Sequence, residues 1–140
     1  MNLLSRKWTA ILLIAVPFWA NAQKGIELKD PSGKIQLNVM LGNTVTYSVS
    51  HGEDVIIGTS PVSMTLTDGT VFGKEPRLKK KKYRTENQMI YPPIYRKQSI
   101  KDHFNELTLE FKGGYSLVFR AYEDGVAYRF ISEEAVYGRK

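Results

Sequence analysis

The feature that most constrains this chain is a period-two alternation of apolar and polar residues between Ser99 and Phe130. Three apolar faces follow one another there, separated by the turns Lys112-Gly113-Gly114 and Glu123-Asp124-Gly125. Period-two alternation places every second side chain on one face of a strand, and short glycine turns join antiparallel neighbours. This region therefore predicts three consecutive antiparallel strands. No window of the chain carries the 3.6-residue apolar stripe of a helix.

The same alternation fills the first half of the chain. Ile35–Leu41 is followed by the turn Gly42-Asn43, and the apolar face returns from Val45 to Val49. We expect Val55-Ile56-Ile57 to form a short buried strand, and a hairpin to form around Asp68-Gly69. Regularly spaced strands of this kind predict an all-β fold, an antiparallel β-sandwich in which each strand buries one face.

The alternation fails between Gly73 and Gln98, where we expect a long surface excursion. The lysine run Lys79–Lys82 and the sequence Tyr91-Pro92-Pro93 do not fit the centre of a sheet. A basic groove with stacking tyrosines for single-stranded nucleic acid is one alternative. Most lysine runs are solvated surface, however, so we predict no nucleic-acid partner. The candidates for stacking on a sugar are Tyr83, Tyr91 and Tyr95.

The N-terminus has the pattern of a secretory signal peptide. Arg6 and Lys7 precede an apolar run of twelve residues, Trp8–Trp19, and Ala20-Asn21-Ala22 is typical of a cleavage site. A run of this length falls well short of the roughly 30 Å hydrocarbon core, so we predict no membrane anchor. We expect residues 1–22 to be removed, residues 23–140 to form one domain, and the product to be periplasmic or extracellular. The chain has no cysteine, so this domain has no disulfide.

One polar cluster invites a chemical interpretation: Asp102, His103, Asn105 and Glu106. A general acid or base at His103, oriented by Asp102, is one alternative. The other, which we favour, is structural, with Asp102 and Asn105 bonding to backbone where the chain turns into a strand starting near Leu107. The chain has only two histidines and no cysteine to complete a metal site.

Catalytic carboxylate pairs are not evident either. Glu123-Asp124 lies in a predicted hairpin turn and Glu133-Glu134 near the chain end, where adjacent acids are usually solvated. From the residues alone we therefore predict no catalytic and no metal-binding residue in this chain.

Several motifs resemble family 97 of the glycoside hydrolases. Ile100–Leu107 (IKDHFNEL) is similar to that family's I-[RK]-[DN]-H-[YF]-N-E-L segment, and Phe119–Phe130 (FRAYEDGVAYRF) follows at the expected interval. Leu66–Phe72 also resembles the family, as does Pro31–Lys34 (PSGK), which overlaps the expected turn Asp30–Gly33 and is followed by an alternating strand. Tyr91–Tyr95 occupies the place of a W-x-P-x-W-G-E stretch but has tyrosines in place of both tryptophans.

The resemblance implies an exo-acting, three-part enzyme of Bacteroidota, mainly α-glucosidases and α-galactosidases. Its parts are an N-terminal galactose-mutarotase-like β-sandwich, a catalytic (β/α)₈ barrel and a small C-terminal β domain, with a calcium ion near the substrate. None of the catalytic or calcium-binding residues maps onto this chain, so we expect no cofactor in it. A structural or interdomain role is implied for the motif residues Asp102, His103, Asn105, Glu106, Asp124 and Gly125.

The expected function is therefore that of a non-catalytic sandwich domain. Its expected partners are the barrel of a parent enzyme and an α-linked saccharide. The alternative is a stand-alone exported carbohydrate-binding module. Because Ile131–Lys140 shows little alternation, we expect the sandwich to be incomplete at its C-terminal end and the chain to be truncated.

Overall fold

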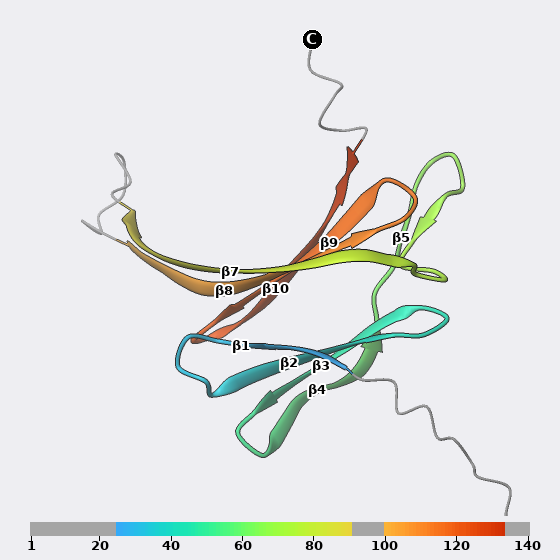
Figure 1. The fold of residues 1–140 in the computed structure, drawn as a ribbon. Coiled ribbons are helices and arrows are strands. Elements are labelled where there is room, and N and C mark those ends of the chain that lie inside the picture. Colours follow the sequence, from blue (N-terminus) through green and yellow to red (C-terminus); the bar gives the residue numbers. More distant parts are fainter. Residues whose placement is uncertain (1–24, 91–99, 134–140) are drawn as a thin grey trace, which may run out of the picture.

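A computed structural model describes residues 25–90 and 100–133, and these residues form two four-stranded antiparallel sheets packed face to face, with a small hairpin at one end (Figure 1). The first sheet has the order β1 (Ile26–Lys29), β2 (Ile35–Leu41), β3 (Val45–His51) and β4 (Asp54–Pro61). The hairpin is β5 (Met64–Thr65) and β6 (Val71–Phe72). The second sheet has the order β10 (Gly125–Ser132), β9 (Tyr115–Tyr122), β8 (Ile100–Phe111) and β7 (Leu78–Ile90). The predicted all-β antiparallel sandwich is confirmed.

The core lies between the sheets, where the alternation places it. Leu37 on β2 faces Val49 on β3 across the ladder, and Leu107 on β8 faces Phe119 on β9. The most buried apolar side chains come from both sheets and are Leu37, Val39, Val45, Leu107, Leu109, Phe111, Leu117 and Phe119. β1 packs over β8 and β2 over β9, so the inner faces of both sheets are removed from water.

The turn between β1 and β2 is organised by Asp30, whose side chain is buried. Its carboxylate accepts hydrogen bonds from the Ser32 hydroxyl, the Ser32 N–H at 2.9 Å and the Ile35 N–H at 2.6 Å. Burial raises the pKa of Asp30, but these hydrogen bonds outweigh that effect and hold the pKa below its ordinary value. The turn expected at Asp30–Gly33 is confirmed, and an ionised carboxylate closes it.

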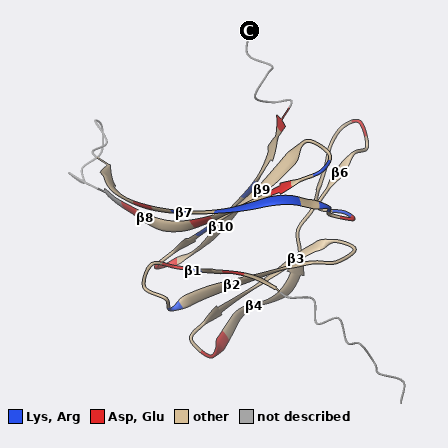
Figure 2. Cartoon of the chain, viewed as in Figure 1, with Lys and Arg blue, Asp and Glu red and all other residues tan. Residues whose placement is uncertain are grey.

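The expected surface excursion between Gly73 and Gln98 is wrong for residues 78–90. They form β7, the longest strand, which pairs with β8 from Leu78 opposite Phe111 to Ile90 opposite Ile100. β7 is an edge strand and nearly all of its side chains are exposed, so no apolar alternation is needed to form it. Lysines run along it (Figure 2). The remainder of the expected excursion, residues 91–98, lies outside the described residues.

The run Val55-Ile56-Ile57 does form a strand, as expected, but it is not buried. Val55 is 69% exposed and Ile56 is 63% exposed. β4 is the edge strand of the first sheet, its pairing with β3 is interrupted by two register shifts, and both of its faces lack a cover among the described residues. The sequence pattern indicates a strand but does not tell which strand lies at an edge.

The predicted signal peptide, residues 1–22, lies outside the described residues and stays a prediction. Within ranges 25–90 and 100–133, no helix has the length and apolar character needed to cross a membrane.

Candidate functional site

The motif residues of Ile100–Leu107 lie inside β8 rather than in a loop before it. The strand was expected to start near Leu107, but it begins at Ile100 because β7 pairs with its whole length. Alternation along β8 divides the motif between two faces. His103, Asn105 and Leu107 share the inner side, whereas Asp102, Phe104 and Glu106 share the outer face.

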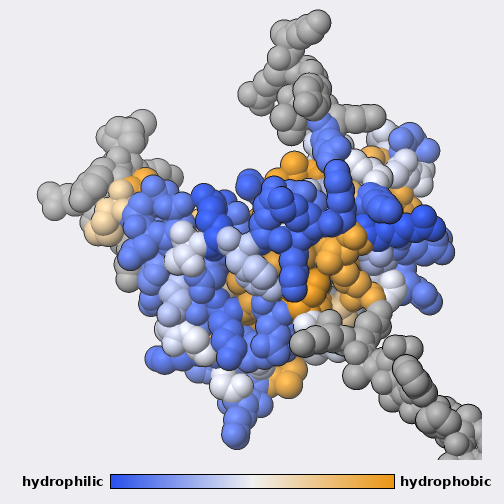
Figure 3. Space-filling view, in the orientation of Figure 1, coloured by the Kyte–Doolittle hydropathy of each residue, from blue (hydrophilic) through white to orange (hydrophobic). Residues whose placement is uncertain are grey.

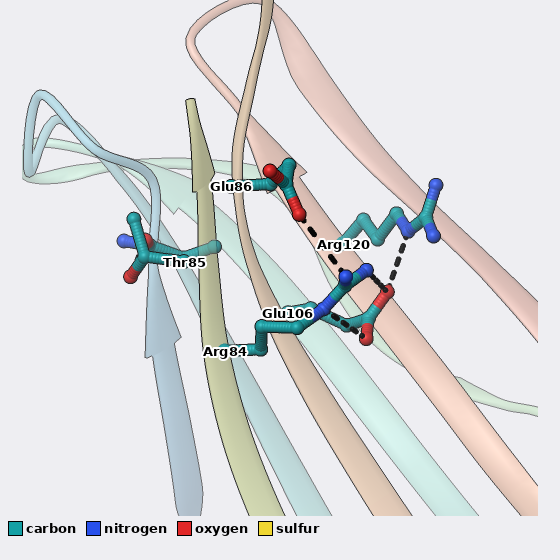
Figure 4. A network of polar contacts seen from close by, with 6 residues as sticks. Arg84, Thr85, Glu86, Glu106 and Arg120 are labelled. Carbon is teal, nitrogen blue, oxygen red and sulfur yellow. Dashed lines mark hydrogen bonds and ion pairs between the residues drawn. The ribbon is translucent and has the colours of Figure 1, made fainter. Parts of the chain in front are cut away.

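Glu106 lies at the centre of an ion-pair network on the outer face of the second sheet (Figure 4). The strand register places it between Arg84 on β7 and Arg120 on β9. Its Oε2 accepts a hydrogen bond from Arg120 Nε at 2.7 Å, and its Oε1 accepts one from Arg84 Nε at 3.2 Å. Arg84 Nη1 also donates to Glu86 at 3.1 Å. Both carboxylate oxygens of Glu106 are therefore occupied.

Phe104 packs beneath this network and is 1% exposed although it faces away from the core. The guanidinium carbon of Arg120 lies 4.3 Å from the Phe104 ring centroid, and that of Arg84 lies 5.7 Å away. The Tyr122 ring also packs against Phe104, at 5.2 Å between centroids. The arginines thus hold the carboxylate and cover the aromatic ring at the same time.

The network also fixes the charge of Glu106, whose side chain is nearly buried. Burial raises the pKa of Glu106, but the guanidinium groups of Arg120 and Arg84 outweigh burial and hold the pKa below its ordinary value. A general acid at neutral pH needs a raised pKa and a free proton to donate. An ionised, fully paired carboxylate is suited to holding strands together.

His103 is not oriented by Asp102, since the two side chains lie on opposite faces of β8. Its Nδ1 lies 3.4 Å from Oε1 of Glu123, in the turn after β9, without hydrogen-bond geometry. The hypothesis of a His103–Asp102 pair is therefore wrong in its geometry. The same turn contains Asp124 and Gly125, which border a groove of about 300 Å³ shared with Ile56 and Ile57 of β4.

Asn105 links the two sheets. Its side-chain amide donates to the backbone carbonyl of Lys29, at the end of β1, at 2.8 Å. Its carbonyl oxygen accepts from the Thr85 hydroxyl of β7, also at 2.8 Å. The structural interpretation of the motif expected Asn105 to bond backbone near the entry of its own strand, whereas the bond crosses to the opposite sheet.

Tyr83 is the one sugar-stacking candidate among the described residues, since Tyr91 and Tyr95 lie outside them. Its side chain is 55% exposed, and its hydroxyl donates to the Glu27 carbonyl of β1 at 3.3 Å. It borders an open groove of about 810 Å³ whose other lining residues include Asn38, Ser48 and Lys81. The sequence does not identify Asn38 and Ser48 as candidate binding residues, because each occupies an ordinary polar position of an alternating strand.

The described residues contain no group of three or more histidine, cysteine, aspartate or glutamate side chains placed to hold a metal ion. The calcium ion that the resemblance implies for complete enzymes is therefore assigned to no residue in ranges 25–90 and 100–133.

One family model covers most of the chain. The model of the family described as glycosyl-hydrolase 97 N-terminal matches residues 28–138. The retaining alpha-galactosidase of Bacteroides thetaiotaomicron is 36% identical over 129 residues, which are 91% of this chain and 20% of that enzyme. The chain thus spans about a fifth of the length of the curated relative it matches.

Solved structures show the same sandwich. A glycoside hydrolase family 97 enzyme in complex with acarbose, from Pseudoalteromonas sp. strain K8, matches with a TM-score of 0.68 and 24% identity over 76% of this chain and 17% of its own. A beta-arabinopyranosidase matches with a TM-score of 0.67 and 22% identity over 75% of this chain and 18% of its own. At these identities the likeness shows the fold.

Proposed function

The chain belongs to the glycosyl-hydrolase 97 N-terminal family, and from this premise we propose that it is a non-catalytic sandwich that supports the catalytic barrel of a parent glycoside hydrolase. The observation that carries the proposal is the state of the family motif. The carboxylate of Glu106 is hydrogen-bonded to Arg84 and Arg120. The side chain of Asn105 is hydrogen-bonded to the opposite sheet. Residues used in this way build a rigid scaffold.

The exposed apolar residues of β4 support a partner on that side of the sandwich. Val55 and Ile56 project from opposite faces of an unpaired edge, and the groove beside Asp124-Gly125 adjoins them. Apolar side chains gathered at one edge are typical of surfaces that are covered in the assembled protein. We propose that the remainder of the parent enzyme, including its barrel, covers this edge.

The catalytic part of the proposal is tested by assaying the purified chain on p-nitrophenyl α-glucoside and p-nitrophenyl α-galactoside. We expect no turnover above that of a denatured control. Turnover that rises in proportion to the concentration of the folded chain would overturn the proposal.

The scaffold part is tested by size-exclusion chromatography with the Bacteroides thetaiotaomicron alpha-galactosidase from which the matching N-terminal fifth has been removed. We expect the chain to co-elute with that protein and the Ile56→Asp variant to elute separately. Lys80→Asp is the matched control, because Lys80 lies on β7 at the far edge of the other sheet. Equal co-elution of both variants would exclude the β4 edge as the contact.

Export and calcium belong to the same proposal. We infer that residues 1–22 direct export and are removed, so that mass spectrometry of the periplasmic product should find Gln23 at its N-terminus. A product that keeps Met1, or that is found only in the cytoplasm, would contradict this. For the parent enzyme we propose a calcium ion held by residues outside this chain.

A further inference from the structure

We propose that the groove lined by residues of β1, β2, β3 and β7 is a saccharide-binding site in which the Tyr83 ring stacks on the face of a pyranose. The inference rests on the proposed function, because a site of this kind serves a domain attached to a glycan-degrading enzyme. It concerns a surface that the scaffold role does not use.

The groove has the mixed lining that such a ligand requires. Its volume is about 810 Å³, with Ile26 and Met40 as apolar residues and Asn38, Ser48 and Lys81 as polar ones. Hydrophobic surface is visible between the lysine-rich strand β7 and the start of β1 (Figure 3). Ligand sites generally combine apolar and aromatic surface with a few hydrogen-bonding groups.

Tyr83 is held in place before any ligand arrives. Its hydroxyl donates at 3.3 Å to the backbone carbonyl of Glu27 on β1, which belongs to the other sheet. More than half of its side chain nevertheless remains exposed. An aromatic ring that is already oriented loses little conformational freedom on binding, which favours affinity.

The polar groups match the chemistry of sugar hydroxyls. The Asn38 amide offers both donors and an acceptor, the Ser48 hydroxyl offers both, and the Lys81 ammonium offers donors. Sugars present hydroxyls that donate and accept around a ring whose C–H faces are apolar. A ligand with one apolar face and many hydroxyls therefore fits this groove better than a purely hydrophobic or a purely ionic one.

The lysine run does not make the groove a nucleic-acid site. Alternation along β7 sends Lys80 and Lys82 to the outer face, away from Tyr83. Lys82 forms an ion pair with Glu110, and Arg84 is paired with Glu106 and Glu86. Lys82 and Arg84 are thus paired with carboxylates, Lys80 lies on the outer face, and Lys81 is the lysine that lines the groove. Nucleic-acid grooves instead concentrate unpaired positive charge along a backbone path.

The site also lies away from the β4 edge. β4 contributes none of the residues that line the groove, and the exposed apolar pair Val55 and Ile56 is therefore separate from it.

The test is a titration of the ¹⁵N-labelled chain with maltotriose, and separately with raffinose, followed by two-dimensional NMR. We expect saturable shifts in the millimolar range that include the Asn38 side-chain amide and the Ser48 backbone amide. Tyr83→Ala should weaken binding about tenfold, as expected for loss of one stacking contact. Tyr128→Ala is the matched control, since Tyr128 is a 48% exposed tyrosine on β10.

A second pair of variants distinguishes loss of binding from loss of folding. Lys81→Ala should weaken binding, whereas Lys80→Ala, its neighbour on the opposite face, should leave binding unchanged. No saturable shift with either saccharide, or equal effects of the Lys80 and Lys81 changes, would overturn the proposal. Binding of a single-stranded oligonucleotide that is lost in Tyr83→Ala and weakens steeply with salt would replace it with a nucleic-acid site. Because the titration uses no barrel, its failure would leave the scaffold proposal standing.

Discussion

The phenolic oxygen of Tyr115 on β9 accepts a hydrogen bond of 3.2 Å from the backbone N–H of Gly73, just after β6. The Gly73 carbonyl in turn accepts from the Val45 N–H of β3 at 2.8 Å. One residue outside either sheet is therefore bonded to both sheets. Tyr115 also stacks on Phe72 at 4.4 Å between centroids, so the β5–β6 hairpin is fixed against the core by a polar and an aromatic contact.

Replacing Tyr115 by Phe should lower the free energy of unfolding by about 1 to 2 kcal/mol. The ring contacts with Phe72 and Phe111 remain, but the buried Gly73 N–H loses its acceptor. Urea unfolding followed by fluorescence measures the difference. Tyr128→Phe, at a half-exposed position, is the control and should be near neutral; equal losses for both variants would show that the Gly73 bond contributes nothing.

Gly73→Ala should be more damaging, by at least about 2 kcal/mol. Gly73 has a φ of 87°, and an added Cβ would lie 2.4 Å from the backbone carbonyl oxygen of Val62. Gly58→Ala is the matched control, because a Cβ there meets nothing within 4 Å. Thermal unfolding compares the two, and a Gly73→Ala protein as stable as Gly58→Ala would refute the strained geometry.

Glu106→Gln should destabilise the chain by on the order of 2 kcal/mol near neutral pH, because two guanidinium groups lose their charged acceptor. The folded pKa of Glu106 lies below its ordinary value, so this stabilisation is fully present above about pH 4.5 and is lost as the pH falls through the folded pKa. The stability difference between the wild-type chain and Glu106→Gln should therefore shrink on acidification.

Chemical denaturation at a series of pH values between 7 and about 3 checks this dependence. Glu110→Gln, which removes a more exposed partner of Lys82, is the control and should cost less. A Glu106→Gln difference that stays constant down to the lowest pH would mean that the carboxylate is not selectively stabilised in the folded chain.

Asn105→Ala should loosen β1 with a loss of about 1 kcal/mol. The Lys29 carbonyl and the Thr85 hydroxyl both lose their partner, while the core side chains of β8 are untouched. Hydrogen exchange should therefore accelerate at Leu28 on β1 but not at Leu109 on β8. Uniform acceleration at both positions would instead indicate global destabilisation.

The sequence predicts the sheet pairs of this fold well where one face of a strand is buried. Leu107, Leu109 and Phe111 alternate because the opposite sheet covers them, and their strand lies where the pattern predicts it. β7 escaped prediction because an exposed edge needs no alternation, and its lysines resemble loop residues. The apolar run on β4 led to the opposite error, because burial was predicted for a strand that is exposed. An apolar run is buried only when another element covers it.

The candidate site was predictable in its residues but not in its contacts. The motif containing Asn105 and Glu106 stands out in the sequence, whereas their partners Arg84, Thr85 and Arg120 are set by the register of β7 and β9. A pairing shifted by one residue would place each side chain on the other face. The groove beside Tyr83 depends on how β7 is placed relative to β1. The local sequence pattern of neither strand predicts that placement.

The edge strands β4 and β7 differ in how readily each would accept a further strand. An incoming strand at β7 would have to lie along the lysines at 79–82, whereas one at β4 would meet the exposed side chains of Val55 and Ile56. Lysine-rich edges resist strand addition and bare apolar edges invite it. Of these two edges, β4 is therefore the one that favours addition of a further strand, whether from a larger native fold or in an unwanted aggregate.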